Sequence, residues 1–426
     1  MLEKKSESTS GSPKVPDSSA PSEQRKSSRF SDGWNPQILP AFFINLVDVL
    51  GMTIIIPLLP FYAEKFGGSP FAVGMLVSAF AFCQLIGGPI LGKMSDSIGR
   101  KPMLMLSQAG TLIGFIILAL APNLTWVFVS RIIDGLTAGN MSLVQAHISD
   151  TTAPEDRAKS FAMLGIAFGV GFFIGPAISG FLSQYSYQYP IYVAAGLSAV
   201  SILLTGILMP NRRFAVDESK LASKKIFDLE LYVRYFKEKK LASILYQWLL
   251  YSMAFAVFTS GFALFAERQF STPNHHFGVK EVGFVLCYVG FLGMILPVTL
   301  TGRLIRVLGD HKTVQLSLAS LMVGYGMLGF VHGTFGLLVS CTLSSFGGGM
   351  LRPVLTSVIT KCAPRTEQGA VLGVSQSLMS LAQILGPLFS GALIDRNMLV
   401  AWSFLAGAFC LAGLAFSAKH GKTMHA

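Results

Sequence analysis

Four ionisable side chains lie inside long apolar runs of the sequence, where charge is costly. Asp48, Arg131, Asp134 and Arg352 each have apolar residues on both sides. A carboxylate or guanidinium at mid-membrane costs about 2.5–3.5 kcal/mol on insertion scales, so each is a functional candidate. A buried carboxylate whose surroundings change can bind a proton in one state and lose it in another. Reversible proton binding is therefore the chemistry that these residues predict.

The composition places these residues in a membrane. The chain has 426 residues, of which 52% are hydrophobic and 13% charged, with a mean hydropathy of +0.57. Soluble proteins have roughly 25% charged residues. The apolar runs are about 20 residues long, which is enough to cross about 30 Å of hydrocarbon, and most lack amphipathic periodicity. The sequence therefore predicts an all-α integral membrane protein.

Twelve membrane spans are predicted, and an alternative count omits the tenth because it contains Arg352. The predicted spans are 38–60, 71–92, 102–121, 124–148, 160–183, 189–209, 241–266, 280–301, 313–332, 335–359, 369–394 and 399–417.

Basic residues set the predicted orientation. With the N-terminus inside, 27 of the 33 Lys and Arg residues fall in inner segments and four in outer ones. This bias predicts that both termini are cytoplasmic and that the chain crosses the plasma or inner membrane many times. It also explains the net charge of +11 through contact with anionic lipid, so no nucleic-acid partner is expected.

Two polar blocks divide the chain. Residues 1–36 are rich in Ser, Pro and Lys and predict a disordered cytoplasmic tail. Residues 211–240 predict a cytoplasmic linker with an amphipathic helix in "FDLELYVRYFKEKK". The linker separates two six-helix bundles, predicted at 37–210 and 241–418, and a short tail follows at 419–426.

The two predicted bundles share ordered matches. Glycine and proline residues recur at an offset of 210 or 211 residues, which suggests an internal duplication. The matches are Gly92 and Gly99 with Gly302 and Gly309, Ala153–Pro154 with Ala363–Pro364, and Gly175, Pro176 and Gly180 with Gly386, Pro387 and Gly391.

The stretch "GKMSDSIGRKPML" between the second and third spans resembles the loop signature of the major facilitator superfamily. Gly92 is expected to let two helices approach closely, and Gly99 to permit a tight turn. Asp96 can face a helix N-terminus or pair with Arg100, which Lys101 follows. A second copy, "GRLIRVLGDHKTV", lies between the eighth and ninth spans. The resemblance implies that the loops latch the cytoplasmic ends of two pseudo-symmetric six-helix bundles.

Three more segments resemble the twelve-span drug:proton antiporters of that superfamily, including the tetracycline efflux pumps. These segments are "LVDVLGMTIIIPLLPFYAEKFG", "SRIIDGLTAGN" with Arg131, Gly135 and Gly139, and "GVGFFIGPAISGF" with Gly171, Gly175, Pro176 and Gly180. The glycines and the proline are expected to pack helices closely. The tetracycline pumps have acids in spans three and nine and a histidine in span eight. The aligned stretches here have none, so tetracycline itself is not the expected substrate.

Asp48 and Arg131 are predicted to take part in proton coupling. Asp48 lies about 15 Å and Arg131 about 10 Å into their spans, so the two could face each other across a cavity. The alternative for Asp48 is a structural hydrogen bond to a neighbouring helix. The resemblance assigns proton transfer to Arg131. Asp134 is either a second protonation site or, as we favour, the partner that neutralises Arg131.

Arg352 is expected to line a central cavity, with Asp48 or an acidic group of the substrate as its counter-ion. Neutral amides and an aromatic ring in other spans would suit amphipathic organic substrates. These further cavity candidates are Asn45, Gln84, Asn140, Gln145, Phe258, Gln376 and Gln383.

The sequence thus predicts a proton-coupled antiporter that exports small amphipathic organic compounds by alternating access. A uniporter or symporter for a metabolite is the second interpretation, and a non-transporting membrane receptor or scaffold the third. No phosphate-binding loop, metal cluster or Ser/His/Asp set is present, so we expect no enzyme and no cofactor. The expected partners are an organic solute, protons and the lipid bilayer, and the expected state is a monomer.

Overall fold

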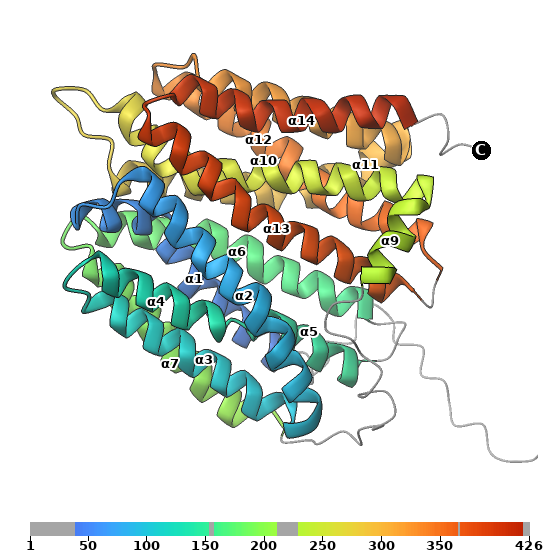
Figure 1. Ribbon diagram of the computed structural model, residues 1–426, viewed down its shortest axis with the longest axis horizontal. Helices are drawn as coiled ribbons and strands as arrows, with labels where there is room; N and C mark the ends of the chain where they lie inside the picture. The colour runs from blue at the N-terminus through green and yellow to red at the C-terminus, as the bar shows by residue number, and fades with distance from the viewer. Residues whose placement is uncertain (1–38, 153–156, 211–228, 365–366, 421–426) are drawn as a thin grey trace, which may run out of the picture. The chain divides into compact units, whose positions relative to one another are not determined.

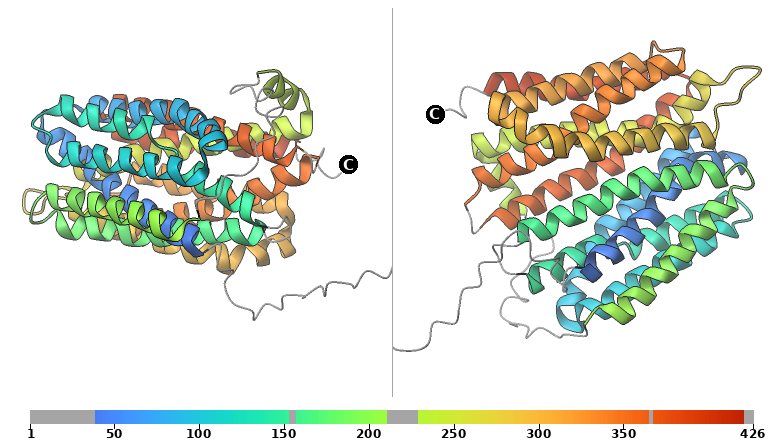
Figure 2. Two further views of the ribbon diagram at one scale, coloured as in Figure 1. Left: turned by 90° about the horizontal axis from the view of Figure 1, so that it is seen from below. Right: turned by 180° about the vertical axis from the view of Figure 1, so that it is seen from behind.

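The computed structural model describes residues 39–152, 157–210, 229–364 and 367–420. Within them the regular structure is helical, apart from an isolated antiparallel bridge between Thr272 and His275. The long helices run side by side along a common direction (Figures 1 and 2). They are α1 (Leu39–Lys65), α2 (Pro70–Ile98), α3 (Arg100–Ala119), α4 (Leu124–Leu136), α5 (Asn140–Thr151), α6 (Arg157–Leu182), α7 (Gln188–Leu208), α9 (Leu229–Lys237), α10 (Lys239–Phe270), α11 (Val279–Leu328), α12 (Thr334–Cys362), α13 (Gln368–Asp395) and α14 (Leu399–His420).

Some predicted segments lie outside the described residues. These are the tail at 1–36, the part of the linker at 211–228, Ala153–Pro154 and the last six residues of the C-terminal tail. In the described part of the linker, α9 is present where an amphipathic helix was predicted.

Ten helices of the described chain are long and apolar enough to cross a membrane. Their most apolar 18-residue windows have mean hydropathies from 1.3 to 2.2. Large apolar side chains remain exposed on them, such as Ile207 at 78% and Val298 at 81%. Water would penalise this exposure, whereas hydrocarbon accepts it. The all-α integral membrane class predicted from the sequence is confirmed.

Two features explain why ten helices qualify where twelve spans were predicted. The 50-residue α11 contains Gly309 with φ 79° and ψ 166°, where two helices meet at a kink. α4 and α5, with 13 and 12 residues, are each too short to cross a bilayer. Counting α11 as two crossings, and α4 with α5 as one, gives twelve, and that count stays a prediction.

The segment predicted as one span over 124–148 contains two helices, because the chain breaks at Thr137–Gly139. Ser107 of α3 satisfies the backbone there: its hydroxyl donates to the Thr137 carbonyl and accepts the Gly139 N–H at 2.9 Å. Backbone polar groups at membrane depth must find partners inside the protein. Ser107 therefore stabilises the interruption.

The turn between α2 and α3 needs glycine, because Gly99 has φ 115°. Side chains rarely tolerate this backbone region. At the opposite end of α2, Ser69 accepts the Ala72 N–H at 3.3 Å and Pro70 occupies the first turn. We call the end of the bundle at which α2 meets α3 the Arg100 end. The end at which α1 meets α2 is the Glu64 end.

The helices pack in two groups. In the first, α1 packs on α6 and α7, and α3 on α4 and α7. In the second, α10 packs on α13 and α14, and α11 on α12 and α14. The core of the second group contains Trp402, which is fully buried, stacks on Phe265 and donates its indole N–H to Ser390 at 2.7 Å.

Two close contacts join the groups, where α2 meets α13 and α6 meets α11 (Figure 1). A Cβ atom at Gly391 of α13 would lie 2.6 Å from the Pro70 carbonyl oxygen of α2. One at Gly283 of α11 would lie 2.5 Å from the Pro176 carbonyl oxygen of α6. Any side chain at these glycines would force the helices apart. Both contacts lie toward the Glu64 end.

The short helix α9 docks on the second group. Its buried Tyr235 donates to Glu367 Oε2 at 3.0 Å, and Arg234 Nη2 lies 2.6 Å from the same oxygen. Burial raises the pKa of Tyr235, so the phenol remains protonated as a donor at neutral pH. The ring of Phe236 packs edge-on against Tyr246 of α10.

Candidate functional site

Asp48 lies on α1 and is held by a polar network from α3 and α7. Gln108 of α3 donates from Nε2 to Asp48 Oδ2 at 3.4 Å and to Ser201 Oγ at 2.8 Å. Thr205 donates to Gln108 Oε1 at 3.0 Å. Gln108, Ser201 and Thr205 are fully buried. Asp48 Oδ1 is also buried and has no hydrogen-bond partner in the described part of the chain.

The close approach of α6 fixes α1 beside this network. Thr53 of α1 donates to the Gly171 carbonyl of α6 at 2.9 Å. A Cβ atom at Gly171 would lie 2.5 Å from Cγ1 of Val49, the neighbour of Asp48, and one at Gly175 would collide with Thr53. These signature glycines therefore set how far α1 lies from α6, and with it the position of the carboxylate.

Arg131 and Asp134 form a buried ion pair on α4. The distance from Arg131 Nη1 to Asp134 Oδ2 is 3.2 Å, and the side chains are 7% and 8% exposed. The Phe80 and Phe115 rings lie 6.0 and 5.6 Å from Arg131 Cζ, which is within cation–π range. Arg131 Nη2 is buried without a partner in the described residues. Among the described residues Arg131 pairs with Asp134 and Asp48 bonds to Gln108, so no hydrogen bond or ion pair joins Arg131 to Asp48 in this conformation.

Glycines position the Arg131 helix as the sequence predicts. A Cβ atom at Gly135 would lie 2.6 Å from the Phe80 carbonyl oxygen of α2, and one at Gly139 would lie 2.9 Å from Leu91 Cδ1. On the other side of α4, a Cβ atom at Gly114 of α3 would lie 3.0 Å from Asp134 Cβ. The ion pair is thus enclosed between α2 and α3.

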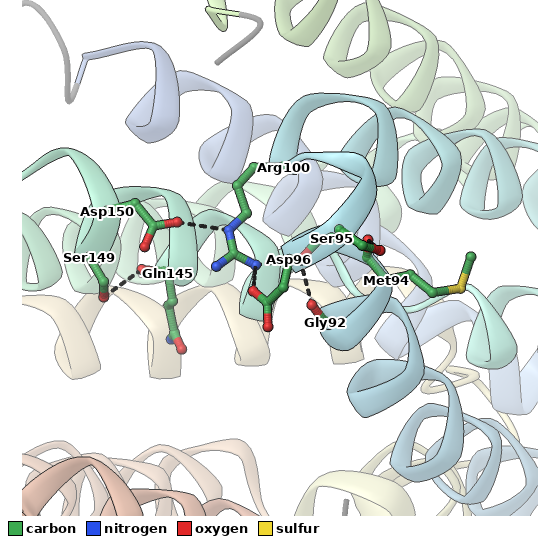
Figure 3. Close-up of polar contacts among 9 residues, drawn as sticks. Gly92, Met94, Ser95, Asp96, Arg100, Gln145, Ser149 and Asp150 are labelled. Atoms are coloured by element: carbon green, nitrogen blue, oxygen red, sulfur yellow. Dashed lines mark hydrogen bonds and ion pairs between the residues drawn. The ribbon is translucent and has the colours of Figure 1, made fainter. Parts of the chain in front are cut away.

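Arg100 organises the loop signature at the turn between α2 and α3 (Figure 3). Its Nη1 lies 2.6 Å from Asp96 Oδ1, and its Nε lies 2.8 Å from Asp150 Oδ2 of α5. Nη1 also donates to Ser95 Oγ, and Ser95 donates to the Gly92 carbonyl at 2.6 Å. Of the two alternatives for Asp96, the structure shows the pair with Arg100. The guanidinium therefore ties the ends of α2, α3 and α5 together.

Lys101 continues this tie to α7. Its Nζ donates to the Gly206 carbonyl at 2.6 Å, in the last turn of α7. Carbonyls there lack partners in their own helix, and a cation is favoured at that end of the helix dipole.

The second copy of the signature contains a pair with reversed charges. Lys361 Nζ at the end of α12 lies 2.5 Å from Asp310 Oδ2, directly after the Gly309 kink. Asp310 follows Arg100 by 210 residues, and Lys361 follows Asp150 by 211. One ion pair therefore joins α3 to α5 in the first copy, and one joins α11 to α12 at the corresponding positions of the second copy. The acid and the base have exchanged places between the two pairs.

One expectation for the loop signature is wrong. Gly92 was expected to bring two helices together, but a Cβ atom there would meet nothing within 4 Å, and the same holds at Gly302. Their carbonyls instead accept hydrogen bonds from Ser95 Oγ and Arg306 Nε, at 2.6 and 3.2 Å.

Two predicted cavity residues are buried. Phe258 is only 4% exposed and stacks on Tyr325 with ring centroids 4.7 Å apart, so it belongs to the aromatic core of the second group. That prediction is wrong for this conformation, because the ring has no open face toward a solute. Asn45 is 2% exposed, and its Nδ2 has no partner in the described residues.

The remaining cavity candidates are more open. Arg352, Gln145 and Gln376 are exposed, and Gln84, Asn140 and Gln383 are half-buried. Asn140 opens α5 just after the break, and its buried Oδ1 has no partner in the described chain. The glycines before Arg352 pack α12 against α11: a Cβ atom at Gly347 would lie 2.5 Å from the Ser317 carbonyl oxygen.

Sequence reasoning missed Gln108, the centre of the Asp48 network. Its signal was present, because it is a lone amide in the apolar stretch "MLMLSQAGTLIGF", and polar residues at that depth are functional candidates. Ser201 and Thr205 gave no comparable signal, since serine and threonine often bond to their own helix.

An ion pair at the Glu64 end joins the two groups and was also missed. Arg268 Nη2 of α10 lies 3.0 Å from Glu64 Oε1 of α1. His276 Nε2 lies 3.7 Å from Glu267 Oε1 beside it, and His275 Nε2 lies 3.6 Å from Glu281 Oε1.

Helices that span a membrane, with polar networks enclosed at mid-depth and ion pairs at the helix ends, define a polytopic membrane transporter. The family model of the Major Facilitator Superfamily matches residues 41–387 and 270–420. The chain belongs to this superfamily.

Curated relatives are similar to this chain over most of their length. A tetracycline resistance protein, class B, of Escherichia coli is 28% identical over 380 residues, which are 88% of this chain and 92% of that protein. Multidrug resistance protein 2 of Bacillus subtilis is 29% identical over 378 residues, 86% and 91% of the two chains. The crystal structure of the human organic anion transporter MFSD10 has a TM-score of 0.67 at 21% identity, covering 90% of this chain and 99% of that one, and shows the same fold.

Proposed function

We propose that this chain is a proton-coupled antiporter that exports small amphipathic organic compounds by alternating access. The relatives named for tetracycline and multidrug resistance support export of such compounds. The observation that supports proton coupling is the half-buried Asp48, which accepts a hydrogen bond at Oδ2 while its buried Oδ1 has no partner in the described residues.

The two groups of helices are proposed to be the two pseudo-symmetric six-helix bundles. Contacts that recur at one offset support this duplication. A Cβ atom at Gly114 would lie 3.2 Å from the Ser130 carbonyl oxygen, and one at Gly324 would lie 3.0 Å from that of Ser340. Both residues of the second contact follow those of the first by 210 residues. The ion pairs Arg100–Asp150 and Asp310–Lys361 are related by offsets of 210 and 211 residues.

Alternating access is supported by where the bundles touch. They are joined at the Glu64 end by the glycine contacts and by the ion pair of Glu64 with Arg268. Cβ atoms at Gly165 of α6, Gly302 of α11 and Gly369 of α13 would meet nothing within 4 Å. These three glycines lie toward the Arg100 end, which we propose faces the cytoplasm. A conformation closed at the Glu64 end, alternating with one closed at the Arg100 end, would move a solute across.

Asp48 is proposed to carry the transported proton. A carboxylate enclosed by three helices changes its surroundings when those helices move, so its proton affinity follows the conformation. Arg131 and Asp134 already neutralise each other at 3.2 Å, and we propose that this pair is structural. If Asp134 were instead a second proton site, Asp134→Asn would lose the coupling of transport to protons.

Reconstitution in liposomes with an imposed pH gradient tests this function. Wild type, Asp48→Asn, Asp134→Asn and the control Asp395→Asn, which changes an exposed acid at the end of α13, are compared with cationic, neutral and anionic dyes. We expect wild type and Asp395→Asn to accumulate at least one dye against its gradient, and Asp48→Asn to accumulate none. Asp134→Asn should keep the coupling to protons.

Other outcomes assign other functions. Dye movement that ignores the pH gradient would indicate a uniporter. Movement of dye and proton in the same direction would indicate a symporter. An absence of movement for every solute would favour a receptor or scaffold.

A further inference from the structure

Arg352 lies in the middle of a membrane-spanning helix with its side chain exposed. It is ten residues before Cys362, the last residue of the 29-residue α12, so it lies about 15 Å from that end. An exposed guanidinium at this depth does not face hydrocarbon, because that contact costs several kcal/mol. This cost favours an aqueous space inside the protein as the surroundings of its exposed surface.

The surroundings of Arg352 place this space beside α10. The guanidinium lies close enough to the buried hydroxyl of Tyr251 on α10 for the two groups to interact electrostatically. α10 is also the helix of the second group that contacts both α1 and α2 of the first. One turn before Arg352, a Cβ atom at Gly349 would lie 3.0 Å from Pro297 of α11. The glycine therefore lets α12 pack closely against α11 there. Arg352 thus lies near α10, which reaches the first group.

Arg352 differs from the other arginines enclosed or paired within this fold. Arg100, Arg131 and Arg268 each form a salt bridge with an acid. None of the salt bridges among the described residues includes Arg352, although charge at this depth normally has a partner. Asp48, the other candidate counter-ion, is held by Gln108 instead.

We infer that Arg352 is the binding site for an acidic group, a carboxylate or a group of similar charge and shape, on the transported compound. Guanidinium presents paired N–H donors that match the two oxygens of a carboxylate. Because Asp48 and Arg352 lie on different groups, the acid and the proton bind at separate places and are linked through the conformational change. This inference rests on the proposed transport function and specifies its substrate class.

A matched pair of probes tests the inference. A fluorescent xanthene dye with a free carboxylate and the methyl ester of the same dye differ at one functional group. Binding of each dye to purified protein is measured by fluorescence anisotropy, and transport of each is measured in proteoliposomes. The variants are Arg352→Gln, Arg352→Lys and the control Arg303→Gln. The control removes an exposed charge from α11, shortly before its kink at Gly309.

We expect wild type and Arg303→Gln to bind the acid more tightly than the ester. Arg352→Gln should weaken binding of the acid by about tenfold or more and leave the ester unchanged. Arg352→Lys should retain part of the preference, because it keeps charge but loses the paired donors. Equal effects of Arg352→Gln on acid and ester would overturn the inference, as would a wild type without preference between the two dyes.

The two measurements separate this inference from the proposed function. Acid-selective binding that requires Arg352, without gradient-driven transport, would retain the binding site and reject the antiporter. Gradient-driven transport with no dependence on Arg352 for either dye would retain the antiporter and reject the acid site.

Discussion

Asp48 shows how a single residue depends on groups that are distant in the sequence. Its position was predicted from the cost of charge in an apolar run, and the Arg131–Asp134 pair followed from their spacing. Its partner was not predictable in the same way. Gln108 is 60 residues away, and only the packing of α3 and α7 against α1 brings the amide to the carboxylate.

Substitution of Gln108 should destabilise the fold, in part because Asp48 loses its hydrogen-bond donor. We expect Gln108→Leu to lower the free energy of unfolding by about 1–3 kcal/mol, because the half-buried Asp48 carboxylate and the buried hydroxyl groups of Ser201 and Thr205 lose a partner. The same substitution in the Asp48→Asn background should cost less, since the charge-assisted bond is already absent. Thermal unfolding of the four purified proteins completes the double-mutant cycle, and strictly additive costs would contradict the network.

The individual helices agree with the sequence where the apolar runs are long and differ where the backbone changes direction. The break at Thr137–Gly139 was missed because the flanking residues continue the apolar pattern, and its stabilising partner Ser107 lies on another helix. Two predicted spans form the single long helix α11, because Gly309 changes the direction of the chain without an intervening loop. Gly99 was easier to predict, since a glycine next to basic residues at a span boundary is a typical turn.

Glycine spacing on α11 allows a sharp test at this scale. Gly283→Val should abolish transport or reduce it strongly, because its Cβ atom would lie 2.5 Å from the Pro176 carbonyl oxygen and keep α6 and α11 apart. Gly293→Val on the same helix should have little effect, since a Cβ atom there would meet nothing within 4 Å. Both variants pay the same helix-propensity cost, so initial transport rates at matched protein levels isolate the contact. Equal rates for the two would show that close approach is not required.

At the scale of the whole molecule, the structure joins its two groups of helices at the Glu64 end. The superfamily and its helical membrane class were predictable from composition and the loop signature. The relation between the groups was not, because it depends on contacts such as Glu64 with Arg268, which are 204 residues apart. The loop signature predicts charges at the turn, whereas the sequence carries no sign of which distant helix end they reach.

A reversible cross-link tests whether the groups must separate at the Glu64 end. Cysteines at Glu64 and Arg268, joined by a short bifunctional thiol reagent that a reductant can cleave, should stop transport, and reduction should restore it. The control joins positions 65 and 187 within the first group, where Lys65 Nζ lies 5.8 Å from the Tyr187 ring centre. That cross-link should leave transport running. Undiminished transport with the bundles joined would contradict alternating access through this end.

Proton release on solute binding tests the central claim most directly. A solute that wild type transports is added to purified protein in weakly buffered solution, and the pH is followed with an indicator dye. The antiporter account predicts that wild type releases protons as the solute binds, whereas Asp48→Asn binds the solute and releases none. The same proton release from Asp48→Asn as from wild type would contradict the account.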